Sequence, residues 1–164
     1  MRGQISIEYL IALSIFLGLI SYIYLRYVGN ITPFIEDVIK EEKRAEAFQI
    51  ANILVNDPGE PADWDSSPNN AKRIGLANQS TNTSNWIKHS KINAFTSQCS
   101  KLQNLLAIER PFNVMIFDVN PSTGVRTPLA LCMSPVLRID QVNATVKRYA
   151  IYDNHKIAEI IVQV

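Results

Sequence analysis

The sequence has little glycine, and its six glycines are scattered over 164 residues. This spread provides no glycine-rich phosphate loop and no G-x-S-x-G nucleophile motif, and H-E-x-x-H and kinase-like sets are also absent. The two histidines, His89 and His155, complete no metal-ligand spacing. We therefore expect no enzyme activity, catalytic residue, cofactor or metal site. Calcium binding at the closest acidic pair in a loop, Asp63 and Asp65, is the remaining alternative.

An excess of charge of either sign is absent as well. The 16 Lys and Arg residues balance the 15 Asp and Glu residues, which leaves no basic surplus for a phosphate backbone. We expect no nucleic-acid partner. The length suits one domain with an appendage.

Charge disappears completely between Glu8 and Arg26, where seventeen consecutive residues are uncharged and mostly apolar. Such a run approaches the roughly 17–25 residues that a helix needs to cross a bilayer. Arg2 and the amino terminus favour a cytoplasmic N-terminus. The carboxylate of Glu8 costs about 2.5–3.5 kcal/mol near the membrane centre and less at the interface. It is therefore an interfacial acid on a plain anchor or an acid that needs a partner.

An ordinary secretory signal peptide is the competing interpretation of this segment. The charged start is short, Met1 to Gly3, and no small-residue cleavage site of the Ala-x-Ala type follows the apolar run. Removal of the apolar segment is thus disfavoured.

The run from Gly3 to Leu10 resembles the class III signal peptide of archaeal type IV pilin-like proteins, with Gln4, Ser6 and Glu8 matching the pattern Q-x-S-x-E. The resemblance implies cleavage between Gly3 and Gln4 by a prepilin peptidase, which leaves the apolar helix in the mature chain. Glu8 would then form an ion pair with the new terminal amine at Gln4 of a neighbouring subunit, offsetting the desolvation of both groups.

A second match lies beyond the membrane segment. Many archaeal pilin-like proteins carry a PG-x-P-x-x-W segment before an I-G-L-A run, which resembles Pro58, Gly59, Pro61 and Trp64 followed by residues 74–77. Two roles fit Trp64. It stacks on a sugar or, as is more common for such a residue, it is a plug that holds a loop on the domain.

The fold class that the periodicity predicts is α+β. Gly29 to Pro33 predict a kink or a short break in the long N-terminal helix, after which residues 34–55 are helical. A further helix is expected over about 92–108, packed on a meandering, four-stranded antiparallel sheet. The expected strands are 112–119, 125–132, 136–152 and 156–164. The expected domains are a leader (1–3), a transmembrane and polymerisation helix (4–28) and an extracytoplasmic pilin-like head (29–164).

Only two cysteines occur, Cys99 on the apolar face of the predicted helix and Cys132 near a strand end. They form a disulfide if the domain lies outside the membrane, or two buried thiols otherwise. Four N-glycosylation sequons are present, some of which arise by chance, and the two in the polar loop are the better candidates: Asn78 and Asn82, then Asn30 and Asn143.

The function implied by the resemblance is a structural subunit, a major or minor pilin, of an archaeal type IV pilus-like filament with a role such as adhesion. Its partners would be the prepilin peptidase, identical or related pilins, and membrane lipid before assembly. It would lie in the cytoplasmic membrane as a single-pass protein and then at the cell surface. The alternative is an anchored adhesion or ligand-binding domain that does not polymerise. A solute receptor is disfavoured by the small size of the domain, and an archaellin by the start motif.

Overall fold

The computed structural model describes residues 7–80, 84–137, 142, 144–153 and 155–164, without the side chain of Thr32. The chain divides into two compact units, of which the first ends at Glu41 and the second runs from Glu42 to Val164. We call the second the globular unit.

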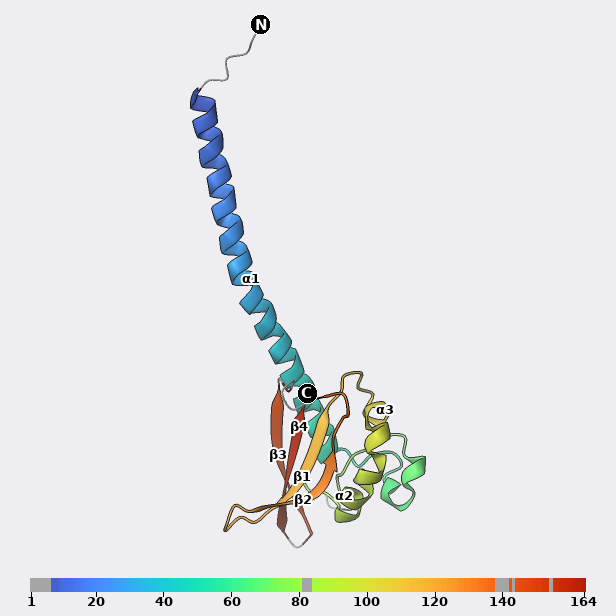
Figure 1. Cartoon of the computed structure of the whole chain (residues 1–164). Coiled ribbons are helices and arrows are strands. Elements are labelled where there is room, and N and C mark those ends of the chain that lie inside the picture. Colours follow the sequence, from blue (N-terminus) through green and yellow to red (C-terminus); the bar gives the residue numbers. More distant parts are fainter. Residues whose placement is uncertain (1–6, 81–83, 138–141, 143, 154) are drawn as a thin grey trace. The chain divides into compact units, whose positions relative to one another are not determined.

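The helix α1 (Ile7–Asn56) is one continuous element of 50 residues (Figure 1). It passes through Pro33 without a break and is slightly bent, so of the two expected outcomes the break is wrong. The separate helix expected from residue 34 is the second half of α1. Proline costs the helix one hydrogen-bond donor, but its fixed φ is compatible with helical geometry. The charged residues and alanines that follow, from Glu36 to Ala47, favour the helix beyond that defect.

The last turns of α1 form one wall of the hydrophobic core. The buried residues recur at helical spacing on one face of α1: Ala47, Ile50, Ala51, Leu54 and Val55. This is the i, i+3, i+4, i+7 pattern of an amphipathic helix. The last turns of α1, from Glu42 onward, therefore belong to the globular unit as a core element.

The sheet contains β1 (Asn113–Val119), β2 (Arg126–Cys132), β3 (Thr145–Tyr152) and β4 (Lys156–Gln163). All neighbouring strands are antiparallel, which confirms the expected α+β class and the strand count. Their spatial order is β2-β1-β4-β3. The expected meander is wrong, because β4 returns to lie between β1 and β3 rather than at the edge (Figure 1).

The third strand is shorter than expected. It begins at Thr145, whereas the pattern predicted a start at residue 136. Val136, Leu137, Val142 and Ala144 lie outside any strand, although Ala144 exchanges backbone hydrogen bonds with Val164. The apolar residues that follow Pro135 have the composition of a strand, but Val136 and Leu137 do not pair with another strand.

A helical stretch from α2 (His89–Phe95) through the 3-10 helix η3 (Thr96–Lys101) to α3 (Leu102–Leu106) covers part of the sheet next to β2. It agrees with the predicted helix, although it begins earlier and has a 3-10 segment in its middle. Ala107 ends it in the left-handed conformation with φ 54°. The short 3-10 helices η1 (Trp64–Ser66) and η2 (Pro68–Asn70) lie in the loop after α1.

Candidate membrane and assembly segment

The first half of α1 exposes its apolar side chains all round. From Ile7 to Val28 the large apolar residues are exposed, in contrast to the buried face near the helix end. Within the described part of the chain, α1 is the one helix that is long and apolar enough to cross a membrane. An α-helix that is apolar on every side needs an apolar environment, either lipid or other helices.

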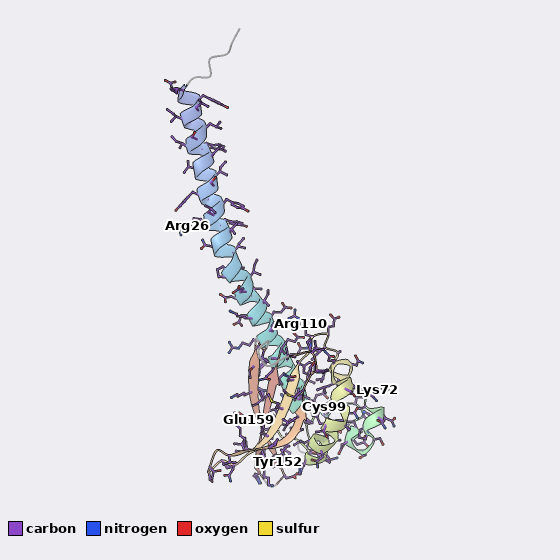
Figure 2. The ribbon with its side chains drawn as sticks, in the orientation of Figure 1. Arg26, Lys72, Cys99, Arg110, Tyr152 and Glu159 are labelled. Atoms are coloured by element: carbon purple, nitrogen blue, oxygen red, sulfur yellow. A yellow bond between two sulfur atoms is a disulfide. The ribbon has the colours of Figure 1, made fainter. Side chains whose placement is uncertain are left out.

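Aromatic and basic residues follow the apolar run. Tyr22, Tyr24 and Tyr27 are exposed around Arg26, which is labelled in Figure 2. Arg26 Nε lies 3.3 Å from the Tyr22 hydroxyl, and the guanidinium lies 5.9 Å from the centre of the same ring. Tyrosine and arginine are enriched where helices leave the hydrocarbon core. This cluster therefore has the composition of a membrane–water boundary.

Glu8 lies in the first turn of α1 and is exposed. The other residues of the signal-peptide motif, Gly3, Gln4 and Ser6, lie outside the described residues, so their geometry and the Glu8 ion pair stay predictions. Another polar residue of the segment satisfies itself within the helix, because the Ser14 hydroxyl donates to the Leu10 carbonyl at 2.8 Å. A carboxylate has no donor with which to do the same.

Cys99 in η3, which is labelled in Figure 2, forms the expected disulfide with Cys132 in β2. Their Cα atoms are 5.1 Å apart. Cys132 is buried in the core and Cys99 is half-buried beside it. The bond fastens the helical stretch to the sheet across 33 residues of sequence.

The loop motif that ends at Trp64 and the run over residues 74–77 meet in space. Trp64 is fully buried, and its Nε1 donates a hydrogen bond of 2.8 Å to the carbonyl of Gly75. Gly59, with φ +84°, leaves room for the indole, because a Cβ there would lie 2.6 Å from a Trp64 ring atom. Trp64 is thus a plug between the loop and the Ile74–Ala77 run, as predicted, and presents no surface for sugar stacking.

Two lysines hold the loops around this plug. Lys91 is buried and donates to the carbonyls of Pro58 and Ala77 at 2.6 and 2.9 Å. Burial lowers the pKa of its amine, although nearby carboxylates oppose the shift. Asp65 accepts hydrogen bonds from Lys88 Nζ at 2.8 Å and Ser90 Oγ at 2.6 Å.

Asp63 and Asp65, the acidic pair considered as a calcium site, have different surroundings, because only Asp65 makes these contacts. Burial alone would raise the pKa of Asp65, but the hydrogen bonds from Lys88 and Ser90 outweigh it and hold the pKa below its usual value. Asp63 is exposed. Within the described residues, no group of three or more His, Cys, Asp and Glu side chains could hold a metal ion.

The four sequons lie in different settings. Asn30 is exposed on α1, and Asn78 is half-buried, with its Oδ1 accepting a 3.1 Å hydrogen bond from the backbone amide of Ser80. Asn82 and Asn143 lie outside the described residues.

A polar cluster that the sequence analysis missed lies on β4. Glu159 is fully buried, and Arg126 binds it through two nitrogens, Nε at 2.7 Å and Nη2 at 3.1 Å. Tyr149 donates a third contact at 3.1 Å, and this hydrogen bond raises the pKa of its phenol. An acid inside the apolar run from Ile157 to Val164 was the available signal, because a strand seldom buries one without a partner.

Comparisons with known proteins identify no relative: no family model, no curated protein and no solved structure matches this chain.

Proposed function

We propose that this chain is a structural subunit, a major or minor pilin, of an archaeal type IV pilus-like surface filament, assembled through the first half of α1 after prepilin-peptidase cleavage. The observation that carries the proposal is the continuity of α1. One helix combines an exposed, apolar first half with last turns that form one wall of a folded core. A helix of this kind suits a subunit that polymerises through an apolar bundle and displays a domain outside it.

The Gln4, Ser6 and Glu8 motif supports the same proposal through its resemblance to class III leaders. The disulfide is also consistent with it, because disulfides persist in oxidising environments outside the cytoplasm. The proposed location is a single-pass state in the cytoplasmic membrane, with the N-terminus inside, followed by a surface filament.

The second candidate is an anchored surface domain that does not polymerise. The exposed tyrosines around Arg26 favour it to the same degree, since a plain anchor also needs a membrane boundary. The resemblance of the leader to class III signal peptides favours the filament subunit over the anchored domain, because a plain anchor needs no peptidase motif.

The test uses cells that produce the full chain. Intact mass should show a mature chain that begins at Gln4, and electron microscopy with subunit-specific labelling should find it in sheared filaments. A mature start beyond Ser21 would identify an ordinary signal peptide. A subunit cut at Gln4 that stays entirely in the membrane fraction would favour the anchored domain.

A further inference from the structure

The sheet has a second face, opposite the core, that is mostly apolar. Strand register arranges it in three rows that cross β2, β1, β4 and β3 in turn. We call it the outer face, and its residues are Leu131, Met115, Ile161 and Lys147, then Pro128, Phe117, Glu159 and Tyr149, then Arg126, Val119, Ile157 and Ile151. Antiparallel sheets with one solvated face usually carry polar side chains there. On the edge strands of this face Leu131, Tyr149 and Ile151 are 49%, 57% and 38% exposed, whereas Ile161 on β4 is buried.

The charge on the outer face is positive. Its one carboxylate, Glu159, is fully buried and neutralised by Arg126. The Arg126 side chain is nevertheless 48% exposed, and Lys147 is exposed on the edge strand β3. A partner for this face would therefore be apolar, with acidic groups that meet Arg126 and Lys147.

A surface of that description occurs on α1. Phe34, Ile35, Val38 and Ile39 are 69%, 50%, 51% and 44% exposed, and their spacing places them on one side of the helix. We call these four residues the α1 stripe. It follows the uncharged run by more than two turns of helix, so it lies outside the hydrocarbon core if that run spans the membrane.

Acidic residues flank the α1 stripe. At 3.6 residues per turn, Asp37 and Glu41 lie along one side of it and Glu36 along the other, whereas Lys40 is on the opposite side of the helix. The segment from Phe34 to Glu41 contains three acids and one base. Its charge is opposite to that of the outer face.

We propose that the outer face of one copy of this chain docks on the α1 stripe of a second copy. The inference rests on the proposed function and deepens it by naming the contact between subunits. The two surfaces differ from each other, so their pairing is heterologous, and a heterologous contact that does not close into a ring extends without limit. The contact would remove two exposed apolar surfaces from water and bring Lys147 and Arg126 toward the acids beside the stripe.

Cysteine cross-linking in the full chain tests this contact. Val38→Cys and Ile151→Cys are introduced together, and cells are treated with a short bismaleimide before denaturing electrophoresis. We expect a ladder of covalent oligomers, several-fold stronger than in the matched variant that carries Lys40→Cys with Ile151→Cys. Lys147→Glu should weaken the ladder several-fold, and adding Asp37→Lys should restore it.

The outcomes separate this contact from the filament proposal, because sheared filaments are assayed in the same cells. Filaments without the ladder would overturn the contact and leave the filament function standing. A ladder in membranes without filaments would support the contact and overturn the filament function. Equal ladders from Val38→Cys and Lys40→Cys, or dimers from Val38→Cys alone at the same yield, would show that the α1 stripe does not face the sheet and would overturn the contact.

Discussion

Gly75 illustrates how a single residue positions the loop that follows α1. An alanine Cβ there would lie 1.9 Å from the carbonyl oxygen of Asp57, which is backbone and cannot move aside as a flexible side chain would. The Gly75 carbonyl also accepts the hydrogen bond from the buried Trp64 indole. We predict that Gly75→Ala lowers the free energy of unfolding by about 3 kcal/mol, the upper part of the usual cost of overpacking. Denaturant titration of the purified full chain, followed by tryptophan fluorescence, measures it.

Gly29→Ala is the matched control for this substitution. Gly29 lies within α1, and an alanine Cβ at this position would meet no described atom within 4 Å apart from its chain neighbours and the nearby helix backbone. Alanine there should leave the globular unit unchanged and favour the helix by about 0.5–1 kcal/mol. Equal losses of stability in both variants would show that the contact with Asp57 is not the cause.

Lys91 is a buried lysine that supplies hydrogen bonds to two loop carbonyls. Its ammonium group serves the carbonyls of Pro58 and Ala77, which Lys91→Met would leave without these donors. We predict that Lys91→Met lowers the free energy of unfolding by about 1–3 kcal/mol at pH 7, the cost of unpaired buried polar groups. Lys72→Met, at an exposed lysine labelled in Figure 2, should change it little.

The pH dependence of the same pair of proteins tests the lowered pKa of Lys91. Between that pKa and the ordinary value of 10.5, the unfolded chain binds more protons than the folded chain, so folding becomes more favourable as pH rises. Lys91→Met lacks this term, and its deficit relative to the wild type should grow toward alkaline pH. A deficit that shrinks over this window would contradict the lowered pKa.

At the scale of elements, the continuity of α1 has its weakest point at Pro33. Proline cannot donate to the carbonyl of Gly29 one turn earlier, and in a helix interior it costs about 3 kcal/mol relative to alanine. We predict that Pro33→Ala slows amide hydrogen exchange around residues 30–37 in the detergent-solubilised full chain. Pro111→Ala, at a proline outside the helices and strands, should leave that segment unchanged. Faster exchange in Pro33→Ala would mean that the proline supports the helix rather than weakening it.

The disulfide joins two elements that are distant in sequence, η3 and β2. Closing a loop of 33 residues stabilises a fold by about 3–4 kcal/mol in the chain-entropy model. We predict that the double variant Cys99→Ser with Cys132→Ser loses about this much free energy of unfolding in denaturant titration. The reduced wild type should lose a similar amount, and an unchanged midpoint in both would contradict a stabilising role for the bond.

The sequence predicted elements better than their arrangement. Helical spacing predicted the helix over 34–55, and segments rich in Val, Ile, Phe and Tyr between turns predicted four strands, because both signals are local. The break at Pro33 was wrong because a local breaker is outweighed by helix-favouring neighbours. The order β2-β1-β4-β3 depends on pairing between distant segments, which a single sequence does not record.

The same limit explains which contacts were missed. The pairing of Cys99 with Cys132 was accessible because the chain has only two cysteines. The contact between Arg126 and Glu159 was not, because 33 residues separate them and many other bases were available. The plug role of Trp64 was favoured over sugar stacking because it is the commoner role of such a residue, yet the lysine that holds its loop, Lys91, looked like one of many surface charges.

At the scale of the whole molecule, the two ends of α1 lie in different environments. Its first half exposes apolar residues from Ile7 to Val28, and its last turns are buried in the core of the globular unit. Near the start of that unit, Arg110 pairs with Glu42 at 2.8 Å and with Glu46 at 3.5 Å. These ion pairs tie α1 to the segment before β1, so the helix is part of the domain it carries.

Glu8 decides between a filament subunit and a plain anchor. If its carboxylate neutralises the terminal amine of a neighbouring subunit, Glu8→Ala should insert into the membrane at least as well as the wild type, because an acid is removed from lipid. Assembly should fall by at least about tenfold, since leaving one member of a buried ion pair alone typically costs about 3–5 kcal/mol. The measurement is the ratio of subunit in sheared filaments to subunit in the membrane, with processing checked by intact mass.

Ser14→Ala is the control within the same apolar helix. Its hydroxyl donates to the Leu10 carbonyl of its own chain, so its loss leaves no group in another subunit without a partner. The ratio for Ser14→Ala should equal that of the wild type. If a correctly processed Glu8→Ala also keeps the wild-type ratio, the ion pair does not drive assembly. If wild-type subunit never enters sheared material, Glu8 is an interfacial acid and the chain is an anchored surface domain, whose exposed apolar helix is covered by lipid alone.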